Sequence, residues 1–464
     1  MHEQVVVGLD FGSSRIKAAA YDRHGMLVAA SSAETPVESL PEGDNFLVLD
    51  MLEAAASVIR DLGCAPGAIA GLGASSMGEV GTVLGEDGLA DLAFPSWYDR
   101  RGGEIVERLE SAWGADDLRT STGNHLRLAS TVAKLGHLAL SSELPRGLFL
   151  GLCGALAWQL TGRGWQEAGL AITSGVYDDA RHRYLEHVWE TAGLRGVELP
   201  PVAESGHHEP AATALARELG LADGAPVVIA GHDHPVASVG AGVRPGEVSD
   251  SMGTGEAIIA VMEPQFAADQ RHRAAALAAD RYVSFEVWPT TGESLVVWER
   301  MRPGLAMRAF VEGAGLDRAL LDAEAPPGST PTVLDEAMSL ELENGGAGGL
   351  PPTPESWAEL IDFYVALANR GQEIVREISG ATGATVLTGG GLRSSRWRHA
   401  KAVRGRAPMV VSTVEETVTR GCAAMAGVAA GWWDSAESMP GAERVPLGDD
   451  AAADMESAVR RMAP

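Results

Sequence analysis

The residues from Gly8 to Lys17 combine side chains and backbone groups suited to holding the phosphates of a nucleotide. An apolar run at 5–7 leads into Asp10, and the turn that follows contains Ser13 and Ser14, so we predict a strand, a tight turn and a second strand. A carboxylate at a strand end can hold a hydrated Mg²⁺ while the amides of a glycine- and serine-rich turn face phosphate groups. The segment therefore predicts phosphoryl transfer, with an ordinary acidic hairpin turn as the alternative.

Two other glycine-rich turns also follow apolar runs. Gly253-Thr254-Gly255 separates two such runs and repeats the pattern of the first segment, which indicates a duplicated architecture with a nucleotide between the halves. Gly389-Gly390-Gly391 follows a short run, and a backbone without side chains can approach a flat or anionic ligand closely, with Ser394 just beyond it. A plain left-handed turn is the alternative for the triple glycine.

Histidine and cysteine give weaker signals. The clusters His207-His208 and His232-Asp233-His234 suggest metal ligation, but no further ligands at metal-site spacing accompany them. The three cysteines (Cys64, Cys153 and Cys422) are far apart and lack CxxC spacing, so we expect small core residues and neither a zinc site nor a disulfide framework.

The elements that must position these groups follow from apolar periodicity. The predicted elements are a helix at 51–62, a strand at 68–75, a hairpin at 81–88, a mostly helical region at 97–219 and a buried strand that begins at 226 and ends in the polar turn 231–233. Thr353 and Pro354 are typical of the start of a helix, which we expect to end near Gly380.

Length and composition limit the class of protein. A chain of 464 residues with 45% hydrophobic residues suggests two or three domains with sizeable cores. No apolar run approaches the roughly 20 residues of a membrane span, and the first residues lack the basic region of a signal peptide, so we expect a cytoplasmic protein without a membrane partner. A formal net charge of -27 argues against a nucleic-acid partner.

Together, the motifs resemble those of the FGGY carbohydrate kinases, which belong to the actin-like ATPase superfamily. The similar segments, in the order of the family, are the first phosphate motif at 10–14, the substrate loop at 97–101, the passages 154–162 and 175–178, the second phosphate motif at 253–255 and the adenosine motif at 389–394. The resemblance implies an α/β protein of two RNase H-like (actin-like ATPase) domains with a nucleotide cleft between them. We expect an N-terminal domain at 1–243 with the sugar site and a C-terminal domain at 244–464 with the adenosine motif.

The resemblance also implies roles for individual residues. Gly231-His232-Asp233 resembles the G-x-D element of the family, so Asp233 is implied to be the catalytic base, and a cap of the following helix is the alternative. Asp10, with Asp233, is implied to organise Mg²⁺. The residues expected to bind ATP are Gly12, Ser13, Ser14, Lys17, Gly253, Thr254, Gly255, Gly389, Gly390, Gly391 and Ser394.

Departures from the family pattern concern the substrate. Xylulokinase-like members carry Met-His-Gly and glycerol kinase-like members carry Arg-Glu where this chain has Met77-Gly78-Glu79, so a carboxylate suited to sugar hydroxyls is present and an arginine is missing. A solvated turn residue is the alternative for Glu79. The residues expected to bind substrate are Met77, Gly78, Glu79, Trp97, Asp99 and Asp233. The lobe usual in the family is not recognisable between 292 and 345.

The expected activity is transfer of the γ-phosphoryl group of ATP to a hydroxyl of a small sugar, and the overall layout favours a ketopentose such as xylulose. A glycerol or other polyol kinase is the alternative enzyme, and a catalytically silent nucleotide-binding regulator is the alternative of another class. A homodimer is compatible with the resemblance.

Overall fold

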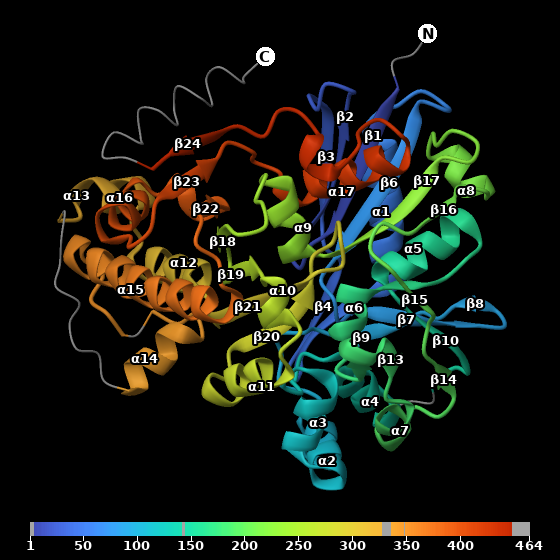
Figure 1. The fold of residues 1–464 in the computed structure, drawn as a ribbon, viewed down its shortest axis with the longest axis horizontal. Coiled ribbons are helices and arrows are strands. Elements are labelled where there is room, and N and C mark those ends of the chain that lie inside the picture. Colours follow the sequence, from blue (N-terminus) through green and yellow to red (C-terminus); the bar gives the residue numbers. More distant parts are fainter. Residues whose placement is uncertain (1–3, 142–143, 327–335, 348, 448–464) are drawn as a thin grey trace. The chain divides into compact units, whose positions relative to one another are not determined.

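The computed structural model describes residues 4–141, 144–326, 336–347 and 349–447, and the chain forms two compact units (Figure 1). The first unit contains the residues up to Gly240 together with Phe285–Glu293 and Val418–Gly441. The second unit contains Ala241–Ser284, Ser294–Thr417 and the residues from Ala442 onward. The unrecognised region 292–345 therefore lies mostly in the second unit, and residues 327–335 of it are outside the described residues.

A six-stranded sheet in the order β16-β17-β6-β1-β2-β3 forms the centre of the first unit. Its strands are β1 (Val5–Phe11), β2 (Arg15–Tyr21), β3 (Leu27–Glu34), β6 (Ile69–Ser76), β16 (His208–Pro210) and β17 (Pro226–His232). β1, β2 and β3 pair antiparallel, whereas β1, β6 and β17 pair parallel. The predicted strand-turn-strand unit and the strands predicted at 68–75 and from 226 are confirmed.

Helices cover this sheet because one face of β1 is apolar and the other contains glycine. Val7 and Leu9 point into a core that includes Met51 and Leu52 of α1 (Val48–Arg60), so the helix predicted at 51–62 is confirmed. α17 (Thr417–Ala429) packs against Gly8, where a Cβ would lie only 1.8 Å from the carbonyl oxygen of Thr419. The absence of a side chain at Gly8 therefore allows α17 to approach the sheet.

The rest of the first unit consists of short elements. Its helices are α2 (Gly103–Trp113), α3 (Ala115–Thr122), α4 (Thr131–Ser141), α5 (Leu152–Thr161), α6 (Ala168–Ile172), α7 (Glu186–Thr191), α8 (Ala214–Glu218) and α9 (Asp233–Gly240). Its further strands are β4 (Val37–Leu40), β5 (Gly43–Leu47), β7 (Gly81–Gly85), β8 (Gly88–Leu89), β9 (Ala93–Pro95), β10 (Gly147–Gly151), β11 (Gln166–Glu167), β12 (Tyr177–Asp178), β13 (Arg183–Tyr184), β14 (Val197–Glu198) and β15 (Val202–Ala203). β7 and β8 form the predicted hairpin. The helices of 97–219 are confirmed, but the prediction omitted the strands among them, most of which are too short to show alternation.

The second unit repeats the strand order of the first. Its sheet has the order β20-β21-β19-β18-β22-β23-β24. The strands are β18 (Val248–Met252), β19 (Glu256–Val261), β20 (Val283–Val287), β21 (Ser294–Met301), β22 (Thr385–Thr388), β23 (Met409–Ser412) and β24 (Arg444–Pro446). The part of β20 from Phe285 onward belongs to the first unit. β21, β19 and β18 pair antiparallel and β18, β22 and β23 pair parallel, as β3, β2, β1, β6 and β17 do in the first unit. The predicted duplication is confirmed in this topology.

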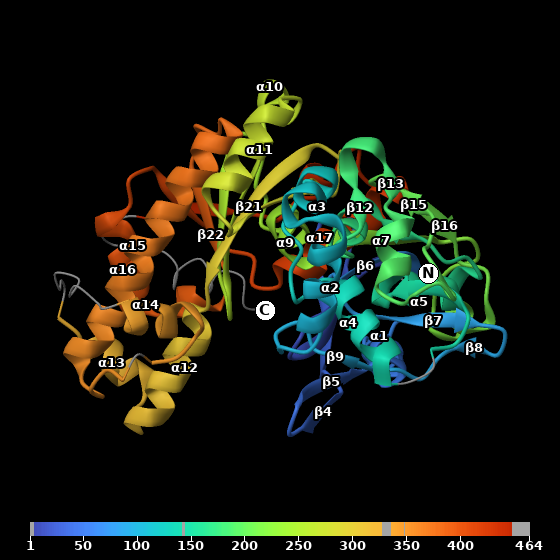
Figure 2. The same ribbon diagram turned by 90° about the horizontal axis from the view of Figure 1, so that it is seen from below.

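The longest helix of the second unit is α15 (Pro354–Ser379), which lies along β21 (Figures 1 and 2). The hydroxyl of Thr353 accepts a hydrogen bond from the amide of Ser356 at 3.3 Å, and Gly380 ends the helix with φ +82°, so both predicted ends are confirmed. The other helices are α10 (Pro264–Ala267), α11 (Gln270–Ala279), α12 (Pro303–Ala314), α13 (Arg318–Glu324), α14 (Glu336–Glu343) and α16 (Ser395–Arg404). In the described part of the chain, no helix has both the length and the apolar character needed to cross a membrane.

Candidate active site

Strand register brings the acidic motifs of the first unit to one edge of its sheet. Asp10 of β1 is opposite Ser75 of β6, and Ser75 is opposite Gly231 of β17. The Ser75 hydroxyl donates a hydrogen bond to the Gly231 carbonyl oxygen at 2.8 Å, which fixes the end of β17. Because these three strands are parallel, Asp10 and the Gly231-His232-Asp233 turn lie at the same carboxyl edge, where ligands of α/β sheets bind.

Asp233 follows β17 directly and is the first residue of α9. Its Oδ1 accepts a hydrogen bond from the backbone amide of His234 at 2.8 Å, and 27% of its side chain is exposed. A capping side chain reaches the second or third amide of a helix, whereas this bond goes to the next residue. The carboxylate therefore does not cap α9, and its exposed part makes it accessible.

Three further ionisable groups lie around this turn. His232 Nδ1 is 3.0 Å from Oε2 of Glu286, and His232 Nε2 is 3.3 Å from Oδ1 of Asp233. Glu167 is 2% exposed and accepts a hydrogen bond from the amide of Leu170 at 3.2 Å. Burial raises the pKa of the Glu167 carboxyl to about 7. Neither Glu167 nor Glu286 was predicted, because each lies far from the turn in sequence and in no recognised motif.

The backbone of Gly78 and Glu79 is held by two threonines. The Thr173 hydroxyl donates to the Gly78 carbonyl oxygen at 2.7 Å, and the Thr131 hydroxyl donates to that of Glu79 at 3.0 Å. A Cβ on Gly78 would lie 2.3 Å from Thr173 Cγ2, so the arginine of glycerol kinase-like members would not fit without displacing Thr173. Glu79 is half-buried, and Met77 is buried with 4% exposure.

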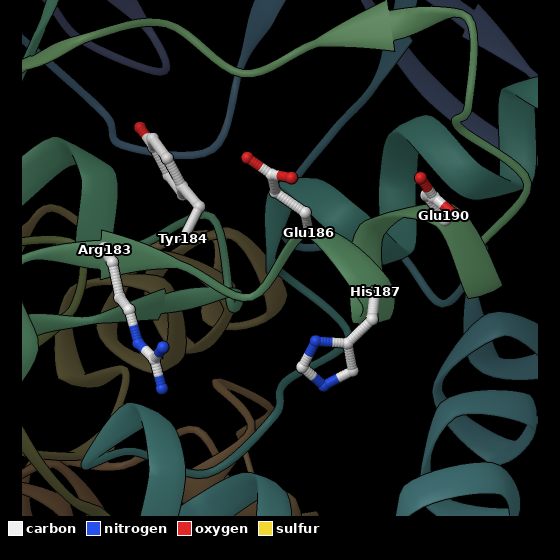
Figure 3. Close-up of a pocket in the computed structure, with 5 residues that line it drawn as sticks. All are labelled: Arg183, Tyr184, Glu186, His187 and Glu190. Atoms are coloured by element: carbon white, nitrogen blue, oxygen red, sulfur yellow. The ribbon is translucent and has the colours of Figure 1, made fainter.

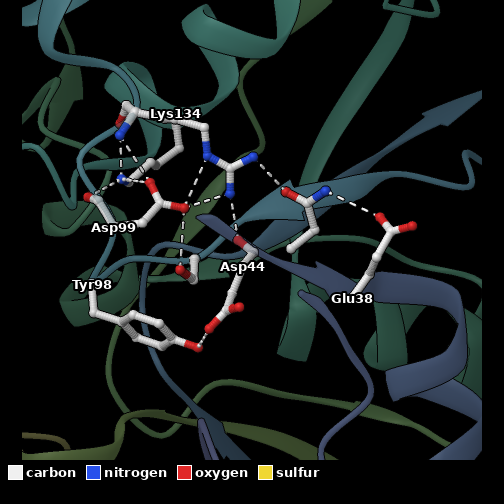
Figure 4. Close-up of polar contacts among 8 residues, drawn as sticks. Glu38, Asp44, Tyr98, Asp99 and Lys134 are labelled. Atoms are coloured by element: carbon white, nitrogen blue, oxygen red, sulfur yellow. Dashed lines mark hydrogen bonds and ion pairs between the residues drawn. The ribbon is translucent and has the colours of Figure 1, made fainter. Parts of the chain in front are cut away.

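The predicted substrate loop is held by an ion cluster (Figure 4). The Asp99 carboxylate accepts hydrogen bonds from Arg101 Nε at 3.0 Å and from Lys134 Nζ at 3.1 Å, and the Lys134 side chain is fully buried. Burial raises the pKa of Asp99, but the Arg101 and Lys134 contacts outweigh this effect and hold the pKa below its usual value. Asp99 thus organises the loop that contains half-buried Trp97, and a direct contact of either residue with substrate stays a prediction.

In the second unit, two of the predicted nucleotide-binding turns are neighbours. Ser251 of β18 is opposite Thr388 of β22, so the turns 253–255 and 389–391 leave the same edge of the sheet. Gly389 has φ +92°, and a Cβ on it would lie 2.7 Å from the carbonyl oxygen of Met252. Gly389 therefore needs glycine for its positive φ and for its close approach to Met252, but its ψ of 171° differs from that of the plain left-handed turn given as the alternative.

Ser394 has a local structural role. Its hydroxyl caps α16 by accepting a hydrogen bond from the amide of Trp397 at 3.1 Å and donates to Oδ1 of Asp322 at 2.9 Å. The side chain is fully buried. Its predicted contact with nucleotide stays a prediction.

The carboxylates available for a metal ion match the needs of magnesium. Among residues 4–141, 144–326, 336–347 and 349–447, no three His, Cys, Asp or Glu side chains gather as a ligand set. Mg²⁺ commonly binds one or two carboxylates and completes its shell with water and substrate phosphates. Asp10, at the strand edge and 9% exposed, and the accessible Asp233 fit that requirement.

An open hollow elsewhere on the first unit contains none of the predicted site residues. Its lining residues are Arg183, Tyr184, Glu186, His187 and Glu190. In Figure 3 the side chains of Tyr184 and Glu186 extend to one side and those of Arg183 and His187 to the other. These groups do not converge on a common point, so the hollow is not a candidate active site.

Residues 5–240 match the model of the FGGY family of carbohydrate kinases, N-terminal domain. The chain therefore belongs to the FGGY family of carbohydrate kinases, as the motifs predicted, and sugar kinases of this family use ATP as the phosphate donor.

Several known proteins and structures align with nearly the whole of this chain. L-fuculokinase from Salmonella typhi is 26% identical over 94% of this chain and 95% of its own length. Autoinducer-2 kinase from Escherichia coli K12 is 25% identical over 93% of this chain and 87% of its own length. The structure of xylulose kinase from Rhodospirillum rubrum covers 99% of this chain and 97% of its own with a TM-score of 0.79 and 20% identity. The structure of Plasmodium falciparum glycerol kinase with ADP covers 100% of this chain and 99% of its own, with a TM-score of 0.78 and 12% identity. The fold is that of the two-domain actin-like ATPases.

Proposed function

We propose that this chain phosphorylates a hydroxyl of a small ketose with ATP, and that Asp233 is the catalytic base. The observation that carries the proposal is the register of β1, β6 and β17, which places Asp10 in line with Gly231, two residues before the accessible Asp233. This is the arrangement expected of a carboxylate that accepts a proton beside a phosphate-binding turn.

The chemistry assigned to Asp233 is a single proton transfer. Its carboxylate takes the proton of the acceptor hydroxyl while the hydroxyl oxygen bonds to the γ-phosphorus and the bond from that phosphorus to the β,γ-bridging oxygen breaks, which releases ADP. Positioning and charge stabilisation provide most of the remaining rate enhancement in such transfers.

The residues proposed to bind ATP are Gly12, Ser13, Ser14 and Lys17 in the first unit and Gly253, Thr254, Gly255, Gly389, Gly390, Gly391 and Ser394 in the second. Asp10 and Asp233 are proposed to hold Mg²⁺, which when bound neutralises phosphate charge. The N-terminal domain, 1–243, is proposed to bind the sugar, and the C-terminal domain, 244–464, to carry the second phosphate and adenosine motifs.

The substrate proposal rests on Glu79 and its tethered backbone. A carboxylate can accept hydrogen bonds from two adjacent hydroxyls of a sugar. Gly78 leaves no space for an arginine, which favours a ketose over glycerol. Xylulose stays the favoured ketopentose, and the names of the curated relatives add L-fuculose and autoinducer-2 as acceptors to test.

The test is an ADP-release assay with xylulose, L-fuculose, autoinducer-2 and glycerol at equal concentration. We expect one of the ketoses to give a kcat/KM at least about tenfold above glycerol, because unpaired polar groups in a hydroxyl-binding site penalise a poor match. A preference for glycerol would favour the polyol kinase instead. Tight ATP binding without turnover on any acceptor would favour the silent regulator.

A further inference from the structure

Glu286, His232 and Asp233 form a continuous chain of polar contacts within the first unit. Glu286 belongs to β20 and lies in the segment Phe285–Glu293, which packs with the first unit although it comes from beyond residue 240. Its Oε2 is 3.0 Å from His232 Nδ1, and the other ring nitrogen of His232 is 3.3 Å from Asp233 Oδ1. The Glu286 side chain is 9% exposed and that of His232 is 15% exposed.

His232 contacts an acidic side chain through each of its ring nitrogens. Nδ1 shares a hydrogen bond with the Glu286 carboxylate, and Nε2 lies within ion-pair distance of Asp233. His232 therefore lies between Glu286 of β20 and the proposed base.

The same contacts orient the Asp233 carboxylate. Within the described part of the chain, the contacts of Asp233 all go to Oδ1, from the His234 amide at 2.8 Å, His232 Nε2 at 3.3 Å and His234 Nε2 at 3.9 Å. One amide hydrogen bond and two nearby imidazole nitrogens on the same oxygen favour one rotation of the carboxylate and leave Oδ2 for a further partner.

We propose that Glu286 and His232 are positioning residues which hold Asp233 so that Oδ2 meets the acceptor hydroxyl. This inference rests on the proposed function of Asp233. Glu286 holds the His232 ring through Nδ1 while Nε2 faces Oδ1 of Asp233, so the pair orients the base.

A purely structural role for the pair is separable, because the segment has another anchor. The side-chain amide of Asn124 donates to the Phe285 carbonyl oxygen at 2.8 Å and accepts from the Phe285 amide at 2.7 Å. These two hydrogen bonds hold the segment to the first unit beside Glu286. Removal of the Glu286–His232 contact should therefore leave the segment in place.

The test compares kcat, both KM values and melting temperature for H232L, H232Q, E286Q and the double variant H232L/E286Q. We expect H232L to lower kcat about tenfold or more with the ATP KM within about twofold of wild type, because only the orientation of the base is lost. H232Q keeps a donor toward Asp233 and should retain several-fold more activity than H232L. The double variant should be no slower than H232L, since residues that act as one unit are non-additive.

The matched control is H207Q, because His207 forms an exposed pair with Glu209 at 3.4 Å in the same unit. It should leave kcat unchanged. Wild-type kcat in H232L, or additive losses in the double variant, would overturn the positioning role. If D233N is also fully active, the proposed function fails as well, whereas an inactive D233N with a fully active H232L rejects this inference alone.

Discussion

At the scale of single residues, Asp99 and Ser394 are held by partners that lie far from them in the sequence. Asp99 and Ser394 matched family motifs, yet Asp99 bonds to Lys134, 35 residues away, and Ser394 bonds to Asp322. Partners so distant in sequence depend on tertiary packing, which local pattern does not determine. Glu167 and Glu286 were missed for the same reason.

Glu79 gives a test of substrate recognition. Glu79→Gln keeps the size of the side chain but removes its charge, and loss of a charged hydrogen bond costs about 1.5–3 kcal/mol. We expect the KM for the best ketose to rise about tenfold or more, with a smaller effect on the ATP KM. Steady-state kinetics with each substrate varied in turn measures both. An unchanged ketose KM would place Glu79 outside the substrate site.

Glu167 predicts a pH dependence of stability. Its pKa is raised from 4.5 to about 7, so between these values the folded chain keeps a proton that the unfolded chain releases. This contribution to stability is complete below pH 4.5 and is lost as pH rises through 7. The groups that face this carboxyl are the amides of Gly169 and Leu170, Glu286 and His232.

Glu167→Gln removes that titration and keeps the shape of the side chain. We expect a melting temperature equal to that of wild type near pH 4.5 and several degrees higher at pH 8, since about 2.5 pKa units correspond to about 3 kcal/mol. Calorimetry of both proteins across this range measures the difference. A difference that does not vary with pH would show that Glu167 ionises normally.

At the scale of elements, patterns with local causes were predicted and a buried ion cluster was not. The helix 354–379 followed from its cap and its terminal glycine. Lys401 of α16 donates to Asp250 of β18 at 2.6 Å and to Glu256 of β19 at 2.7 Å, and all three side chains are fully buried. The cluster joins the strands on both sides of the 253–255 turn to the helix that follows the adenosine motif. Periodicity alone assigns such residues to a solvated surface.

Lys401→Met should destabilise the protein strongly. It leaves the acidic side chains of Asp250 and Glu256 buried without their cation, and breaking a buried ion pair typically costs about 3–5 kcal/mol. We expect a clearly lower melting temperature, and the triple variant D250N/E256Q/K401M should recover most of the loss because no net charge stays buried. A melting temperature of Lys401→Met equal to that of wild type would show that the cluster contributes nothing to stability.

At the scale of the whole molecule, the duplication was visible in the sequence because both copies keep a strand, a glycine-rich turn and a strand. The pairing of β1 with β6 and of β18 with β22 then follows the same plan in each unit. The sequence did not indicate with which unit the segment 285–293 packs. It joins the first unit after the chain has entered the second, and no local pattern encodes that return.

The most direct test of the account is the turnover of Asp233→Asn with the best acceptor. Asparagine keeps the size of the side chain and an oxygen for the His232 and His234 donors, but it cannot take the proton of a hydroxyl. We expect kcat to fall about 10²-fold or more, the usual scale for a positioned base, while calorimetry gives an ADP affinity within about twofold of wild type. A kcat close to that of wild type would contradict the assignment of Asp233 as the base.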